Sequence, residues 1–125
     1  MPCPLGVAMG GGISVHAVDV ANGRIARGML VQIDRIEEDG ARLRIAEGRI
    51  AADGTLDHPV AQGAGVRAGL HEILLHVGAF FAGSDRPPPP FLDVVPFRFR
   101  VFDDAQHYHL PVKFTPWGMS LYRGA

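Results

Sequence analysis

Apolar and polar residues alternate along several short segments of this chain. Alternation with a period of two places successive side chains on opposite faces of a β-strand, so each segment predicts a strand with one buried face. Gly and Pro are abundant but form no repeat, which is typical of a β protein with many turns. The segments that predict strands are 13–20, 29–37, 41–46, 94–102 and the two halves of 106–125.

Short turn signals separate these segments, and they are Asn22-Gly23, Asp39-Gly40 and Asp53-Gly54. Residues 56–66 are irregular and rich in Gly, and residues 70–78 fit a helix or a strand equally well by period alone. Residues 86–90 include four prolines, which cannot continue a helix or an inner strand and therefore predict an extended loop. Seven to eight strands with short connections predict an all-β fold, a β-sandwich.

The last segment predicts a β-hairpin whose turn contains Pro116 and Gly118. One face of its incoming strand is apolar and predicts a core face, formed by Tyr108, Leu110, Val112 and Phe114. The opposite face carries two imidazoles and an ammonium, more ionisable groups than a solvent face requires, and therefore offers candidate site chemistry. Its members are His107, His109, Pro111, Lys113 and Thr115.

Length and charge limit the classes of function. The 125 residues suit one domain with a single core, which we expect at 13–125 after a flexible arm at 1–12. The net charge of −1 gives no reason to expect a nucleic acid or an anionic membrane as partner, and no apolar run approaches membrane-spanning length. The single cysteine, Cys3, and the lack of signal-peptide features at 1–4 fit a cytoplasmic protein.

Neither a cofactor nor a metal is expected. The Gly10–Gly12 run is not followed by the Lys-Ser/Thr pair and helix that a phosphate loop needs. The histidines show no spacing typical of zinc ligands. Three of them, His58, His71 and His76, are expected to be structural or exposed.

Two motifs at opposite ends of the chain resemble the signatures of the transthyretin-related family, which includes the 5-hydroxyisourate hydrolases of purine breakdown. The C-terminal motif comprises residues 107–111, Thr115-Pro116 and residues 122–125, and the N-terminal motif comprises residues 13–19 and 23–26. Together they span nearly the whole chain. The resemblance implies a transthyretin-like sandwich, a strand at 70–78 followed by a short helix, and a homotetramer whose central channel buries the polar face.

The resemblance also implies site residues and a reaction. His16 and His109 correspond to the catalytic histidines of the family, and the substrate would be a small cyclic ureide whose amide is hydrolysed. One imidazole would take a proton from water and the other would serve the leaving ring nitrogen, for which imidazole has a suitable unperturbed pKa. The residues expected to contact the substrate are His107, Lys113, Arg123, Tyr122, Ser120 and Thr55.

The chain departs from the family pattern at two positions. Thr55 stands where the hydrolases carry an arginine, and Ala125 stands where they end in serine. Lys113, at a position that is usually apolar, or Arg49 could supply the missing cation. The function therefore stays open between a hydrolase for 5-hydroxyisourate or a substituted ureide, a non-catalytic carrier of small ligands, and a homologue with a diverged reaction.

Overall fold

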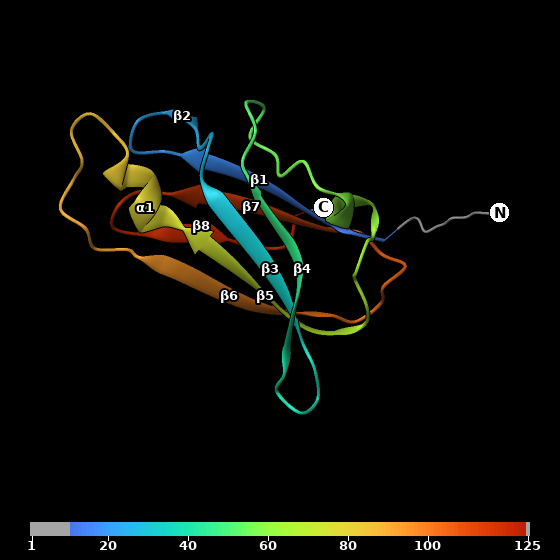
Figure 1. The fold of residues 1–125 in the computed structure, drawn as a ribbon. Coiled ribbons are helices and arrows are strands. Elements are labelled where there is room, and N and C mark those ends of the chain that lie inside the picture. Colours follow the sequence, from blue (N-terminus) through green and yellow to red (C-terminus); the bar gives the residue numbers. More distant parts are fainter. Residues whose placement is uncertain (1–10, 125) are drawn as a thin grey trace.

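The computed structural model describes residues 11–124, and it forms two four-stranded sheets packed as layers (Figure 1). Most of the predicted N-terminal arm, including Cys3, and the terminal Ala125 lie outside the described residues. The first sheet has the order β2-β1-β7-β8. Its strands are β1 Ile13–Asp19, β2 Arg24–Ile25, β7 Tyr108–Phe114 and β8 Met119–Leu121.

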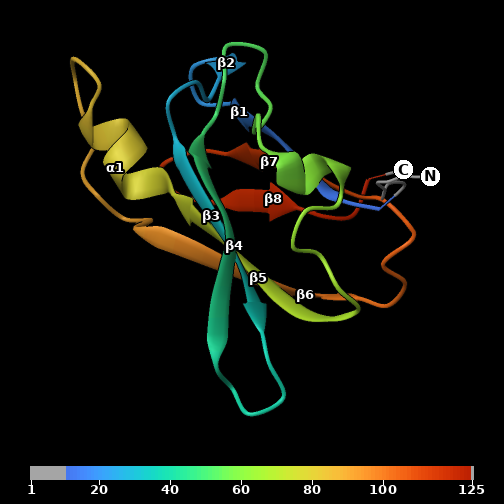
Figure 2. The ribbon, with the colours of Figure 1, turned by 45° about the vertical axis from the view of Figure 1, so that its right-hand side comes forward.

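The second sheet has the order β4-β3-β5-β6 and is antiparallel throughout. Its strands are β3 Leu30–Ile36, β4 Arg42–Arg49, β5 Gly69–His76 and β6 Val94–Val101. The tip of the β3–β4 hairpin extends beyond the sandwich (Figure 2). Two short helices complete the described part of the fold, the 3₁₀ helix η2 Pro59–Gln62 and the α-helix α1 Val77–Ala82. Neither helix formed by residues 11–124 has the length and apolar character needed to traverse a bilayer.

The core lies between the sheets and is built by the alternation seen in the sequence. β1 alternates buried and half-buried residues along its full length, and β7 buries the apolar face predicted for it. Burial of such side chains contributes roughly 1.5–3 kcal/mol each, relative to leaving them exposed. The largest fully buried side chains include Phe114, Ile13, Met29, Ile33 and Ile73.

Most sequence predictions of secondary structure are confirmed. Residues 69–76 form a strand that leads directly into α1, and the terminal hairpin closes with a hydrogen bond from the Thr115 amide to the Gly118 carbonyl. The third strand runs three residues beyond the predicted end, to Arg49. The irregular stretch 56–66 contains η2, which the sequence analysis did not predict. His58 caps this helix by accepting a hydrogen bond from the Val60 amide.

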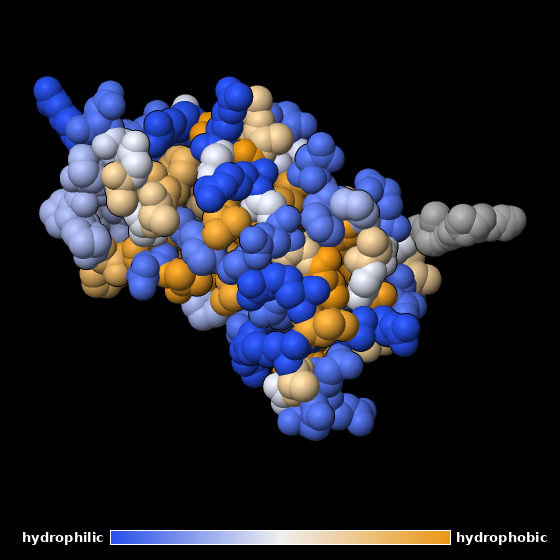
Figure 3. Space-filling view, in the orientation of Figure 1, coloured by the Kyte–Doolittle hydropathy of each residue, from blue (hydrophilic) through white to orange (hydrophobic). Residues whose placement is uncertain are grey.

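The outer face of the second sheet carries a network of ion pairs. Charged residues gather over the lower part of the β3–β4 hairpin, where the surface is strongly hydrophilic (Figure 3). Two carboxylates at its centre, Asp34 and Glu72, are buried although they point outward, because arginine side chains cover them. The arginines that contact these two carboxylates are Arg42, Arg44 and Arg98.

Candidate active site

The first and last long strands of the chain are neighbours and run parallel. The register pairs Ser14 with His109 and His16 with Pro111. His16 and His109 are therefore diagonal neighbours on one outer face, with Cα atoms roughly 8 Å apart given the usual strand spacing and rise. The parallel pairing of β1 and β7 brings the two predicted catalytic imidazoles onto one surface.

Ser14 joins two of the histidines on this face. Its Oγ lies 2.7 Å from Nε2 of His107 and 2.7 Å from Nδ1 of His109. The other ring nitrogen of His107, Nδ1, lies 3.1 Å from the carbonyl oxygen of Gly11. A hydrogen-bonded chain thus runs from the backbone before β1, through His107 and Ser14, to His109.

The surroundings of His109 favour its neutral form. Partial burial lowers the pKa of its imidazole below the ordinary value, and the nearby imidazoles of His107 and His16, which repel a further positive charge whenever they are protonated, lower it further. The chain after β8 passes beside it, since the Gly124 amide donates to the His109 carbonyl at 2.7 Å. A neutral imidazole has one free lone pair, so His109 can accept a proton near neutral pH.

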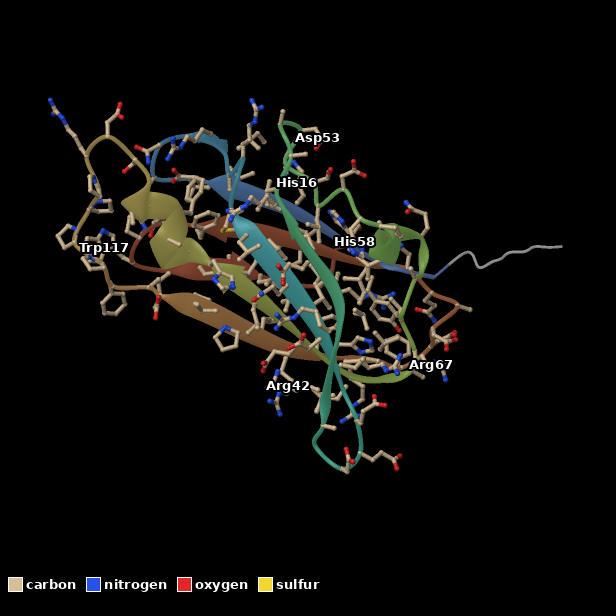
Figure 4. The ribbon with its side chains drawn as sticks, viewed as in Figure 1. His16, Arg42, Asp53, His58, Arg67 and Trp117 are labelled. Carbon is tan, nitrogen blue, oxygen red and sulfur yellow. The ribbon has the colours of Figure 1, made fainter. Side chains whose placement is uncertain are left out.

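His16 is packed against the turn that follows β4, and Figure 4 shows it beside Asp53 of that turn. The Ala17 amide donates to the Gly54 carbonyl at 2.9 Å, and His16 and Thr55 form an isolated β-bridge. Gly54 has φ +90°, and a Cβ placed on it would lie 2.6 Å from Nε2 of His16. Only glycine therefore permits this close approach of the turn to the imidazole.

The same turn presents a carboxylate to His16. Asp53 Oδ1 accepts hydrogen bonds from the Thr55 hydroxyl at 2.7 Å and from the Thr55 amide at 3.0 Å. These hydrogen bonds lower the pKa of the Asp53 carboxyl, and the charge of His16 adds a smaller effect of the same sign. The hydroxyl of Thr55 is thus bonded to Asp53, and the turn is anionic.

Residues 13–124 match the family described as HIUase/Transthyretin, which is nearly the entire described chain. This chain belongs to the HIUase/Transthyretin family.

Individual relatives agree with this assignment. The 5-hydroxyisourate hydrolase 2 of Rhizobium meliloti is 40% identical over 117 residues, covering 92% of this chain and 97% of the relative. The solved structure of Klebsiella pneumoniae 5-hydroxyisourate hydrolase is similar with a TM-score of 0.75 at 27% identity, covering 92% of this chain and 99% of the other. Sea bream transthyretin, solved with thyroxine, has a TM-score of 0.80 at 20% identity and covers 90% of this chain and 94% of that one, a likeness of fold. The predicted transthyretin-like sandwich is confirmed.

Besides His107, three of the residues expected to contact substrate share the outer face with His109: Lys113, Ser120 and Tyr122. Lys113 is exposed and lies in register with Val18 on one side and Ser120 on the other. The pairing of β7 with the chain after it places exposed Tyr122 opposite Pro111. Among residues 11–124 no carboxylate lies within ion-pair distance of Lys113.

Two arginines considered from the sequence lie elsewhere. The Arg123 guanidinium lies 4.2 Å from the ring centroid of Tyr108 and donates to the Gln106 side chain and the His107 carbonyl. Arg49 donates to the Gly28 carbonyl at 3.0 Å and lines a separate hollow with Arg24 and Arg27. In this structure neither guanidinium is directed at the imidazoles.

The sequence analysis missed two contributors to this site, Ser14 and Asp53. Ser14 belongs to the same alternating face as His16, so periodicity could have found it, but serine alone gives no chemical signal. A hollow of about 640 Å³ beside Ser14 is lined by both residues together with Thr55, Asp57 and His58.

The structure shows no metal site in the part of the chain that it describes. Within the described residues no group of three or more His, Cys, Asp or Glu side chains is arranged to hold a metal ion.

Proposed function

We propose that this protein is a hydrolase that opens the cyclic amide of 5-hydroxyisourate, or of a closely related ureide, in purine breakdown. The observation that carries the proposal is the placement of His16 and His109 on one face of adjacent strands, with His109 half-buried and neutral. The names of relatives at 33–40% identity over most of the chain support the same reaction class.

The reaction needs one proton acceptor and one proton donor. Water attacks the amide carbonyl carbon while one of its protons passes to Nε2 of His109. The C–N bond of the ring then breaks, and its electron pair stays on the ring nitrogen. That nitrogen receives a proton from His16, which leaves a carboxylic acid and an N–H group. General acid–base catalysis of this kind contributes about 10²–10⁴ to the rate.

The groups that hold the substrate differ from the family pattern. Lys113 supplies the cation on this face in place of the missing arginine, and Ser120 and Tyr122 line the path between it and His109. Thr55 forms the rim beside His16. Arg123 contributes only if its guanidinium leaves the ring of Tyr108. A ureide whose ring substituents differ from those of 5-hydroxyisourate fits this changed set of contacts.

A homotetramer completes the site in this proposal. Packing the outer faces of the first sheets against one another encloses the imidazoles in a channel and excludes bulk water, which strengthens polar interactions with the substrate. The polar character of this face and the family's architecture support this arrangement. The single cysteine supports a cytoplasmic location.

The direct test mixes purified protein with freshly prepared 5-hydroxyisourate and follows the loss of its ultraviolet absorption. Acceleration over buffer that disappears in the His16→Gln and His109→Gln variants is the expected result. Loss of absorption at the buffer rate with the unaltered protein would exclude the ordinary substrate.

A carrier function is the second candidate, and Thr55 is the observation that favours it. The turn next to His16 carries the Thr55 hydroxyl, bonded to Asp53, at the position where the resemblance places an arginine in the hydrolases. A small aromatic ligand that raises the melting temperature without being consumed would support the carrier.

A further inference from the structure

The hydrogen bonds around Ser14 form a chain with a single direction. Nδ1 of His107 faces the carbonyl oxygen of Gly11 at 3.1 Å. A carbonyl oxygen can only accept, so Nδ1 of His107 must carry the hydrogen. In a neutral imidazole the other nitrogen is then an acceptor, and here that nitrogen, Nε2, faces the hydroxyl of Ser14 at 2.7 Å.

The position of the Ser14 hydrogen determines which nitrogen of His109 is protonated. A serine hydroxyl has one hydrogen, and Nε2 of His107 takes it. Ser14 Oγ can then only accept from Nδ1 of His109, which lies 2.7 Å away, so Nδ1 of His109 carries a hydrogen. The lone pair of His109 is left on Nε2, an atom without a hydrogen-bond partner among residues 11–124.

We propose that Ser14 and His107 are positioning residues that fix the tautomer of His109 and keep its Nε2 free to accept the proton of the attacking water. The effect on turnover rests on the proposed hydrolase function, whereas the tautomer itself does not. This gives His107 a role through Ser14 in place of the substrate contact expected from the sequence, and it gives Ser14 a role that its residue type did not suggest.

The same hydrogen bonds are kept when His109 becomes protonated. When Nε2 of His109 takes a proton, Nδ1 keeps its hydrogen and continues to donate to Ser14 Oγ. No hydroxyl has to turn and no partner is lost during proton transfer. Without Ser14, the imidazole is free to adopt the Nε2–H tautomer that is preferred in water, which cannot accept a proton at the nitrogen used for catalysis.

Partial burial makes this control necessary. The lowered pKa of His109 favours the neutral imidazole, and in that form the identity of the protonated nitrogen decides whether it can act as a base at Nε2. An exposed imidazole that exchanges freely between tautomers would need no such device.

The experiment measures the tautomer of His109 by ¹⁵N NMR of histidine-labelled protein, together with kcat/KM. We expect hydrogen at Nδ1 in the unaltered protein. Ser14→Ala, and independently His107→Phe, should shift His109 toward the Nε2–H form and lower kcat/KM roughly 10- to 100-fold, below the full contribution of a general base. Ser14→Thr keeps the hydroxyl and should restore both properties.

Ser84→Ala is the matched control, because it removes a serine hydroxyl that donates to the Phe81 carbonyl in the loop after α1. It should leave the tautomer and kcat/KM unchanged. Thermal melts of each variant separate loss of fold from loss of the hydrogen-bonded chain.

Three results would overturn the proposal: an Nε2–H tautomer in the unaltered protein, an unchanged tautomer in Ser14→Ala, or a changed tautomer with unchanged turnover. If the unaltered protein does not hydrolyse the ureide at all, the proposed function fails. The NMR measurement on the unaltered protein and Ser14→Ala then still decides whether the chain sets the tautomer.

Discussion

The two outer faces of this sandwich use charged residues in opposite ways. On the second sheet, Glu72 accepts hydrogen bonds from Arg42 at 2.8 Å and Arg98 at 3.2 Å. Burial alone would raise the pKa of its carboxyl, but these two guanidinium groups outweigh burial and lower it. On the first sheet, His109 makes one side-chain hydrogen bond within the described part of the chain, and its other ring nitrogen has no partner there.

This difference shows what makes an ionisable residue available for chemistry. A carboxylate held by two arginines has its lone pairs occupied, and changing its protonation state disrupts a network. An imidazole anchored at one nitrogen is oriented but still able to exchange a proton at the other. The number of charged residues on a face is therefore a poorer guide to function than the number of atoms left without partners.

The largest expected effect comes from comparing one imidazole on each face. His109→Gln should lower kcat/KM by about 10²–10⁴ because it removes the proton acceptor. His76→Gln removes an imidazole from the other face, where Nε2 of His76 is bonded to Gln32 at 2.8 Å, and should leave turnover within about 2-fold. Steady-state kinetics of both variants measures this difference. Equal losses of kcat/KM would show that His109 has no special role in turnover.

Breaking the network of the second sheet should affect stability and spare activity. Glu72→Gln removes the charge that two arginines share, and we expect the free energy of unfolding to fall by about 1–3 kcal/mol. Urea denaturation measures this change, and kcat/KM should stay at its original value. A loss of turnover without a loss of stability would contradict the structural role of this face.

His71, buried in the core between the two faces, should make stability depend on pH. Burial lowers the pKa of its imidazole, Nδ1 is bonded to the Gly69 carbonyl, and Nε2 has no hydrogen-bond partner among residues 11–124. The unfolded chain therefore binds a proton more readily, so stability is present above the unfolded pKa of about 6.5 and is lost as pH falls toward the folded value.

The variant His71→Phe should weaken this dependence. The pKa of His109 is also lowered, so His109 likewise makes the protein less stable as the pH falls. Some dependence of stability on pH should therefore remain in the variant. Urea denaturation at a series of pH values between neutral and mildly acidic conditions measures the slope. A variant with the same slope as the unaltered protein would show that the imidazole of His71 does not titrate on unfolding.

The smallest effect concerns cations on the two faces. Lys113→Met should raise KM a few-fold with little change in kcat, since an exposed charge contributes roughly 0.2–1 kcal/mol. Arg100→Met removes an exposed cation from the other sheet and should change neither value. Substrate-saturation curves at low ionic strength make the difference easiest to see, because salt screens it. If both variants behave alike, Lys113 does not contact the substrate.

Much of the fold could be predicted from the sequence because strand alternation is a local property. The core face of β7 and the terminal hairpin followed from residue type and spacing, whereas the strand at 69–76 was favoured by the family resemblance because its period alone fits a helix equally well. The polar face with His107, His109 and Lys113 followed from the same period of two. The helix η2 did not, because its four residues are too few to show a helical period.

The family resemblance supplied the pairing of His16 with His109, and the residues alone did not. Between these positions lie more than ninety residues, and no local pattern specifies which strands become neighbours. The burial of Glu72 and Asp34 could not be predicted from the sequence either. Alternation assigns both residues to an outer face, and they are buried because arginines of neighbouring strands cover them.

The order of residues alone determined which side chains face the interior and which face outward, because the pleat of a strand fixes that choice residue by residue. The tertiary structure decided which outward-facing groups meet. Parallel pairing of β1 with β7 placed Ser14 between the imidazoles of His107 and His109. The hydrogen bond from His107 to the Gly11 carbonyl then determined which atoms donate and which accept along the chain of hydrogen bonds. Such contacts depend on strand neighbours and register, which are set by the packing of the whole chain.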